Sequence, residues 1–262
     1  MKKILSLGVL CSLFALPAVS KADFLYNFNS ATPNGGTANF APQDGWSIND
    51  STEDLSFLVE TAPGDNAVAL GGYLSAPSVG AVNLTHTAGE TLDGGTFSVD
   101  FALINRDSTD PGNFFNEDDS FSINLSGTEG LNYTLTLIPS ATENIREILS
   151  TNSTDTGGIL TNDATDAGSY TLSISFTASG ADLNYVAQVI GSTTGTFTGT
   201  LAGAATSQLT SFGVTFDTTD PNPANAGSNY ILVDNFAFVP EAGTAALSLM
   251  AVGALSLRRR RR

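Results

Sequence analysis

Alternation of apolar and polar residues along the middle of the chain limits what it can fold into. In residues 170–177, Tyr170, Leu172, Ile174 and Phe176 alternate with serine and threonine. The same alternation recurs in residues 97–103, 121–125, 133–137 and 212–216. Successive side chains of a β-strand point to opposite faces, so each stretch predicts a strand with one apolar face.

Turn-forming residues separate these stretches. Clusters of glycine, proline, asparagine and aspartate occupy residues 32–36, 93–95, 110–113, 156–158 and 220–223. Only residues 143–149, ENIREIL, predict a short helix. The pattern indicates an all-β fold, an antiparallel, jelly-roll-like β-sandwich of roughly ten to fourteen strands. One domain over residues 23–238 is the simplest interpretation, and two small sandwiches dividing near residues 150–167 are the alternative.

The first 22 residues have the three parts of a secretory signal peptide. Two lysines precede an apolar stretch, and Pro17 is followed by small residues. We expect export by the Sec machinery, with cleavage after Ala22 and a mature chain that begins at Asp23. Cleavage after Ser20 is the alternative. The only cysteine, Cys11, lies inside this segment, so the mature domain has no disulfide.

The other end, residues 239–262, combines an apolar run with a basic terminus. The uncharged residues 245–257 precede five arginines: Arg258, Arg259, Arg260, Arg261 and Arg262. A spanning helix needs about 20 residues, so the run is short, but arginines at its end favour the cytoplasmic side of a membrane. A permanent C-terminal anchor is one interpretation.

Val239, Pro240 and Glu241 stand before that run. A motif, an apolar helix and an arginine cluster in this order resemble the PEP-CTERM sorting signal of exported bacterial proteins, with Ala242 in place of the second proline. The resemblance implies a transient anchor in the inner membrane, processing by an exosortase, and delivery to the cell surface or to extracellular polysaccharide matrix. The predicted organisation is a signal peptide (1–22), a sandwich (23–238) and a sorting tail (239–262).

Acidic residues dominate the body of the chain. Between the two ends, 25 of the 26 acidic residues are opposed only by Arg106 and Arg146, a formal charge of about −23. Such a surface repels phosphate, which argues against nucleic-acid binding, and it favours divalent cations. The densest acidic cluster, residues 116–119, lacks the ligand spacing of a calcium-binding loop and predicts a solvated loop.

The order of the predicted strands also resembles secreted jelly rolls of the concanavalin-like and carbohydrate-binding-module kind. Residues 24–28 are the expected first strand, and residues 230–238 are the expected last strand beside it. The resemblance implies a calcium ion held by a carboxylate of the last strand and by oxygens of the N-terminal strand.

Asp234 is the candidate carboxylate. Alternation places it on the inward face of the last strand, together with four apolar residues: Tyr230, Leu232, Phe236 and Phe238. A buried, unpaired carboxylate is costly and no lysine is near, so we expect Ca²⁺ bound by Asp234 and the side-chain oxygens of Asn27 or Asn29. An aspartate at the sheet rim, hydrogen-bonded to backbone, is the alternative. No other cofactor is expected.

Residue types that carry catalysis are scarce. His86, the only histidine, alternates like a strand residue, and we expect it at the surface or paired across strands. No Gly-x-Ser-x-Gly motif and no zinc-binding histidine pair occur. Trp46, the only tryptophan, either fills the core or stacks on sugars, and its neighbours favour the core.

We therefore expect a non-enzymatic protein of the cell surface or extracellular matrix with a structural or adhesive role. A carbohydrate-binding module on the same scaffold is the alternative, and a secreted polysaccharide hydrolase that uses paired carboxylates is the third reading.

Overall fold

The alternating stretches form strands, as predicted. The computed structural model describes residues 24–31, 40, 43–50, 56–63, 65–71, 80–92, 94–105, 119–138, 145–150, 159–161, 168–191, 194–218 and 229–240. Residues Ala22–Glu241 form one compact unit. The predicted signal cleavage between Ala22 and Asp23, residue Glu241 of the sorting motif, the five C-terminal arginines and the helices expected in the signal peptide and in the apolar run lie outside the described residues.

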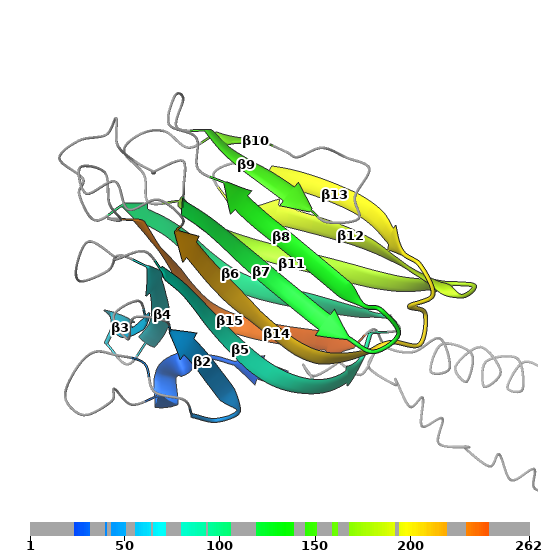
Figure 1. Cartoon of the computed structure of the whole chain (residues 1–262), viewed down its shortest axis with the longest axis horizontal. Helices are drawn as coiled ribbons and strands as arrows, with labels where there is room; N and C mark the ends of the chain where they lie inside the picture. Colours follow the sequence, from blue (N-terminus) through cyan, green and yellow to red (C-terminus); the bar gives the residue numbers. More distant parts are fainter. Residues whose placement is uncertain are drawn as a thin grey trace, which may run out of the picture. The chain divides into compact units, whose positions relative to one another are not determined.

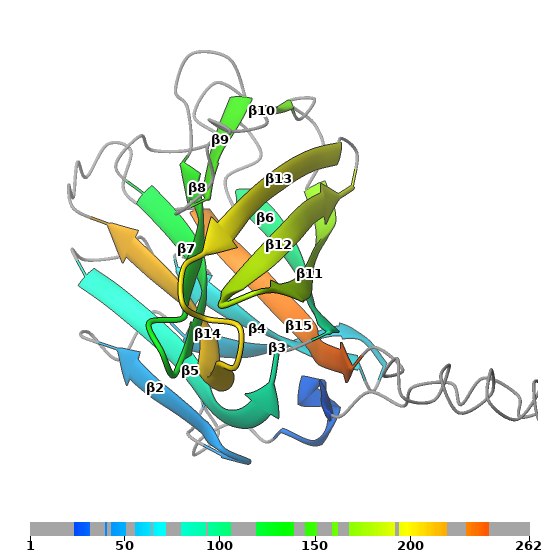
Figure 2. The same ribbon diagram turned by 90° about the vertical axis from the view of Figure 1, so that its right-hand side faces the viewer.

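The described strands form two antiparallel sheets (Figures 1 and 2). The first sheet has the order β13 (Thr194–Leu201), β12 (Asp182–Ile190), β11 (Gly168–Ser179), β6 (Gly95–Asn105), β15 (Asn229–Pro240), β4 (Asp65–Gly71) and β3 (Ser56–Ala62), and β1 (Phe24–Tyr26) also pairs with β15. The second sheet has the order β10 (Ile159–Thr161), β9 (Ile145–Ser150), β8 (Asn132–Ile138), β7 (Asp119–Gly127), β14 (Gln208–Thr218), β5 (Gly80–Thr91) and β2 (Trp46–Asp50). The all-β, antiparallel β-sandwich is confirmed.

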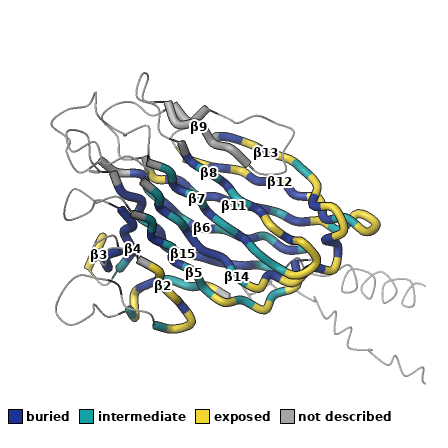
Figure 3. Tube along the Cα trace, viewed as in Figure 1, coloured by how far each residue is buried: buried dark blue, intermediate teal, exposed yellow. Residues whose placement is uncertain are grey.

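The core lies between the two sheets and uses the apolar positions of the alternating strands. On β12, buried and exposed residues alternate, with Leu183, Tyr185, Ala187 and Val189 buried. Figure 3 shows the same alternation along the neighbouring strands. Removal of these side chains from water is the main source of stability for such a sandwich.

Small polar residues line much of the outer faces, which point away from the other sheet, and a separate apolar cluster of Phe57, Ala69 and Tyr230 lies on β3, β4 and β15. On the first sheet, the hydroxyl oxygens of Thr96 and Ser175 lie 3.0 Å apart across β6 and β11. On the second sheet, those of Ser122 and Thr136 lie 3.2 Å apart across β7 and β8. These cross-strand contacts tie neighbouring strands together on their solvent side.

One predicted element is wrong. Residues 143–149 were expected to form a short helix, but Ile145–Ser150 is strand β9, which pairs with β8 on one side and with β10 on the other. The helix preference of glutamate, leucine and arginine is small, and pairing with two neighbouring strands overrides it.

The first and last strands are neighbours, as predicted, and Tyr26 of β1 lies opposite Phe236 of β15. β15 is longer than the predicted last strand, because it continues through Val239 and Pro240 of the sorting motif. Those two residues lie opposite Thr96 and Gly95 of β6. A proline is accommodated at the end of a strand because its missing N–H costs little there.

Candidate functional site

A β-bulge in β15 interrupts the regular pairing of the first sheet. Asp234 is opposite Asp100 of β6, whereas the next paired residue, Ala237, is opposite Ser98, so the register shifts between them. Asn235 within the bulge has a φ of 52°, in the left-handed region that asparagine adopts more readily than most residues.

The bulge changes which residues of β15 face the core. Ile231 and Val233 belong to the core before the bulge, and Phe236 and Phe238 belong to it after the bulge. Asp234 shares the outer face with its register partner on β6. The inward orientation that uninterrupted alternation predicted for Asp234 is therefore wrong.

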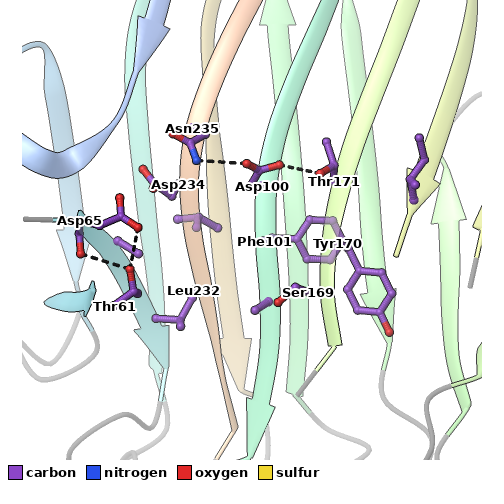
Figure 4. Close-up of a pocket in the computed structure, with 14 residues that line it drawn as sticks. Thr61, Asp65, Asp100, Phe101, Ser169, Tyr170, Thr171, Leu232, Asp234 and Asn235 are labelled. Carbon is purple, nitrogen blue, oxygen red and sulfur yellow. Dashed lines mark hydrogen bonds between the residues drawn. The ribbon is translucent and has the colours of Figure 1, made fainter. Parts of the chain in front are cut away.

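A pocket of about 450 Å³ opens beside the bulge. Along β15, pairing with β4 ends at Val233, and pairing with β1 begins at Phe236. Neither β4 nor β1 pairs with the two residues in between, Asp234 and Asn235. The polar lining of this Asp234 pocket includes Thr61, Asp65, Asp100, Ser169, Thr171, Asp234 and Asn235 (Figure 4). With Ile190 of β12, the described lining residues come from six strands.

Neighbouring side chains hold two of the three carboxylates. Thr171 Oγ1 donates to Asp100 Oδ1 at 2.6 Å, and Asn235 Nδ2 donates to Asp100 Oδ2 at 3.1 Å. Thr61 Oγ1 lies 3.1 Å from both the backbone oxygen and Oδ2 of Asp65. Asp100 thus bridges β11 and β15 with both of its oxygens.

The carboxylate of Asp234 is less completely hydrogen-bonded. Asp234 is only 9% exposed, and its buried Oδ1 has no hydrogen-bond partner among the described residues. The pKa of Asp234 is raised from 3.8 to about 6, mainly by burial and also by the charges of Asp65 and Asp100, while the backbone N–H groups of Asn235 and Phe28 act to lower it. The fold stabilises this carboxylate poorly in its ionised form.

The predicted calcium partners have other contacts. Asn27 Oδ1 accepts from the backbone N–H of Asn29 at 3.4 Å, at the start of the 3-10 helix η1 (Phe28–Ser30). Asn29 Oδ1 accepts from the backbone N–H of Asn66 at 2.8 Å. Neither asparagine is among the lining residues of the Asp234 pocket. Calcium at Asp234 stays a prediction, and the described residues include no group of three His, Cys, Asp or Glu side chains placed to hold a metal ion.

Trp46 and His86 lie in an aromatic cluster between the sheets. Trp46 is 3% exposed, so the predicted core position is confirmed. His86 is opposite both Trp46 and Phe212 in the register, which confirms the cross-strand placement. The rings of His86 and Phe212 are stacked with centroids 5.1 Å apart. Burial lowers the pKa of His86, so the neutral imidazole serves packing in this cluster.

A backbone carbonyl closes the edge of this cluster. The Asp44 oxygen accepts from the Tyr26 hydroxyl at 3.0 Å and lies 3.1 Å from His86 Nε2. Burial, followed by the nearby charge of Asp44, raises the pKa of Tyr26 to about 12. Both polar groups therefore contact the loop before β2.

A second, smaller pocket of about 210 Å³ lies on the outer face of the second sheet. Thr134 Oγ1 donates to Asn124 Oδ1 at 3.0 Å, and Asn124 Nδ2 donates to Thr215 Oγ1 at 3.1 Å. Thr215 Oγ1 in turn donates to Asn83 Oδ1 at 2.6 Å. These groups satisfy one another, in contrast to the unpartnered oxygen of Asp234.

Three residues of the Asp234 pocket, Asp65, Asp100 and Asn235, were not identified from the sequence. Asp100 occupies an outward position between Val99 and Phe101, where serine and threonine are the rule, and this signal could have identified it. Asp65 and Asn235 give no comparable signal, because their places depend on the β3–β4 hairpin and on the bulge.

Comparisons with known proteins identify no ligand for this chain. No protein-family model matches the chain, and no curated protein matches it. Among solved structures, lectin II from Ulex europaeus is 12% identical over 84% of this chain and 99% of its own, with a TM-score of 0.48. A legume lectin-like domain from Entamoeba histolytica is 9% identical over 75% of this chain and 90% of its own, with a TM-score of 0.48. Likeness at this level carries over neither a ligand nor an activity.

The part of the chain that the structure describes contains no helix long and apolar enough to span a membrane.

Proposed function

We propose that this chain is an exported, non-catalytic β-sandwich of the cell surface or extracellular matrix, delivered by its C-terminal sorting signal. The observation that supports it best is the character of the outer faces, where serine, threonine and asparagine side chains bond mainly to one another. Among the described residues, the exposed large apolar side chains are Leu25, Val186 and Ile190, and none is aromatic. Such faces suit a hydrated structural or adhesive body.

Delivery is tested by fractionating cells that express the full chain and measuring the intact mass of the surface-released form. Sorting predicts a released form that lacks the apolar run and Arg262. A variant with glutamine at the five C-terminal arginines is expected to stay out of the surface fraction. A released form that still includes Arg262 would contradict sorting and support the permanent anchor.

A carbohydrate-binding role is the second candidate, and the Asp234 pocket is the observation that favours it. Its size falls within the range of small-ligand sites, and its lining combines hydrogen-bond acceptors with apolar side chains. Binding of glycans to the released protein, without any release of cleaved sugar, is the expected result. Cleavage of a bound glycan would replace this role with the third reading, a hydrolase.

A further inference from the structure

Burial of the Asp234 carboxylate lowers the stability of the folded protein. Asp234 is more than nine-tenths buried, and one carboxylate oxygen has no partner among the described residues. A buried ionised group without full compensation lowers stability, and neutral asparagine would fill the same space at less cost. An unsatisfied buried polar group in a native fold calls for an explanation, and a bound ion, water molecule or ligand is one.

The negative charge of the pocket indicates that its ligand is cationic. Asp65 and Asp100 lie on either side of Asp234 in Figure 4, and none of the described residues that line the pocket is a lysine or arginine. A cationic ligand would balance the charge of these carboxylates. An ammonium group supplies the positive charge together with three hydrogen-bond donors.

The spacing of the carboxylates favours a ligand larger than one ion. The described residues contain no three acidic side chains placed to share a metal ion, although three aspartates line this pocket. A ligand that carries several donors over its length reaches carboxylates that do not converge. Leu232 on β15 and the 48% exposed Ile190 on β12, strands that β6 and β11 separate, add apolar surface at two sides of the pocket, where the C–H face of a sugar ring can pack.

We propose that the Asp234 pocket binds an amino sugar with a free ammonium group. Asp234 pairs with the ammonium, and Asp65 and Asp100 accept from the ammonium or from ring hydroxyls. This inference rests on the carbohydrate-binding candidate and specifies its substrate class: a polysaccharide that carries unacetylated amino groups. A hydrogen bond between an ammonium group and a carboxylate is charge-assisted, and such bonds are stronger than those between neutral groups.

The test is isothermal titration calorimetry at pH 7.5 on the exported protein, with a glucosamine trimer, an N-acetylglucosamine trimer and calcium chloride as separate probes. The glucosamine trimer is expected to bind at least tenfold more tightly than its acetylated form. Asp234→Asn should lose at least tenfold in affinity, and Asp65→Asn should lose less. Asp217→Asn on β14, in the other sheet, is the matched control and should bind like the wild type.

The other outcomes overturn the proposal in distinguishable ways. Equal binding of the two trimers would exclude the ammonium contact and leave the carbohydrate-binding role standing. Binding of neither trimer would exclude the amino-sugar site, and the carbohydrate-binding role would then be decided by the binding of other glycans to the released protein. Calcium binding that depends on Asp234, without sugar binding, would make the pocket a metal site. A purely structural role for Asp234 predicts that Asp234→Asn unfolds more easily, whereas a ligand-binding role predicts lost binding in a protein that is at least as stable.

Discussion

Asp234 and Asp100 are register partners across β15 and β6, yet their carboxylates have opposite environments. Both oxygens of Asp100 accept hydrogen bonds from side chains, whereas Oδ1 of Asp234 accepts none from the described residues. Asp100 therefore ties three strands together, and Asp234 is the member of the pair that a ligand can complete.

Asp234→Asn is expected to stabilise the unliganded protein above pH 6. The folded state raises the pKa of Asp234 from 3.8 to about 6, so the unfolded chain releases this proton at a lower pH than the folded one. The fold thus keeps its full stability from this group below pH 3.8 and loses it as pH rises through 6. The variant should gain about 1 to 3 kcal/mol at pH 8 in urea unfolding, and the gain should vanish near pH 4. A variant less stable than Asp217→Asn at pH 8 would contradict this.

His86 is expected to make the fold sensitive to mild acid. Burial lowers its pKa in the folded state, so below pH 6.5 the unfolded chain takes up a proton that the folded one resists. Stability from this group is present above pH 6.5 and is lost as pH falls. Because Asp234 acts in the opposite direction, the comparison is made in the Asp234→Asn background, with and without His86→Gln. The glutamine variant should lose less stability between pH 7.5 and pH 5.5, and equal losses would contradict the prediction.

Gly213→Ala is expected to destabilise the second sheet. A Cβ at Gly213 would overlap the backbone carbonyl of Leu84 on the neighbouring strand, so the two strands must move apart. We expect a loss of about 1 to 3 kcal/mol in the free energy of unfolding. Gly89→Ala on β5 is the control, because its Cβ would have no heavy atom within 4 Å. Equal effects of the two substitutions would show that glycine flexibility, and not crowding, decides the cost.

Trp46→Ala is expected to open a large cavity between the sheets. The indole is 3% exposed and lies with its ring centroid 5.0 Å from that of Phe236 and 5.2 Å from that of Phe28. Truncation of a buried tryptophan costs about 3 to 5 kcal/mol. Chemical unfolding measures the loss. Ser47→Ala, at the next and exposed position of β2, should change stability little, and a similar loss there would contradict the assignment of the cost to the core.

The strands could be predicted from the sequence because alternation reports directly on which face is buried. Residues 170–177 and 212–216 lie in β11 and β14, and the first and last strands are adjacent. β9 could not be predicted this way, since ENIREIL has no alternation and becomes a strand through its partners on both sides.

Only part of the candidate site could be predicted from the sequence. Asp234 was identifiable as a polar residue within an apolar strand, but its orientation depends on one residue, Asn235, that adopts a positive φ. Alternation counts residues and cannot detect a bulge. Phe236 and Phe238 lie in the core as predicted, but Leu232 and Asp234, which precede the bulge, were assigned to the wrong face. Asp65 and Asp100 reach the same pocket only through strand pairing across the first sheet.

The continuation of β15 through Pro240 has a mechanical consequence. A pull on the chain beyond Pro240 acts along a strand that lies inside the first sheet and is paired with β6 from Asn229 to Pro240. Such a load is a shear, which strains many hydrogen bonds at once instead of opening them one after another. While the chain is tethered through its C-terminal end, tension is therefore borne by the interior of the sheet and not by an edge that peels away.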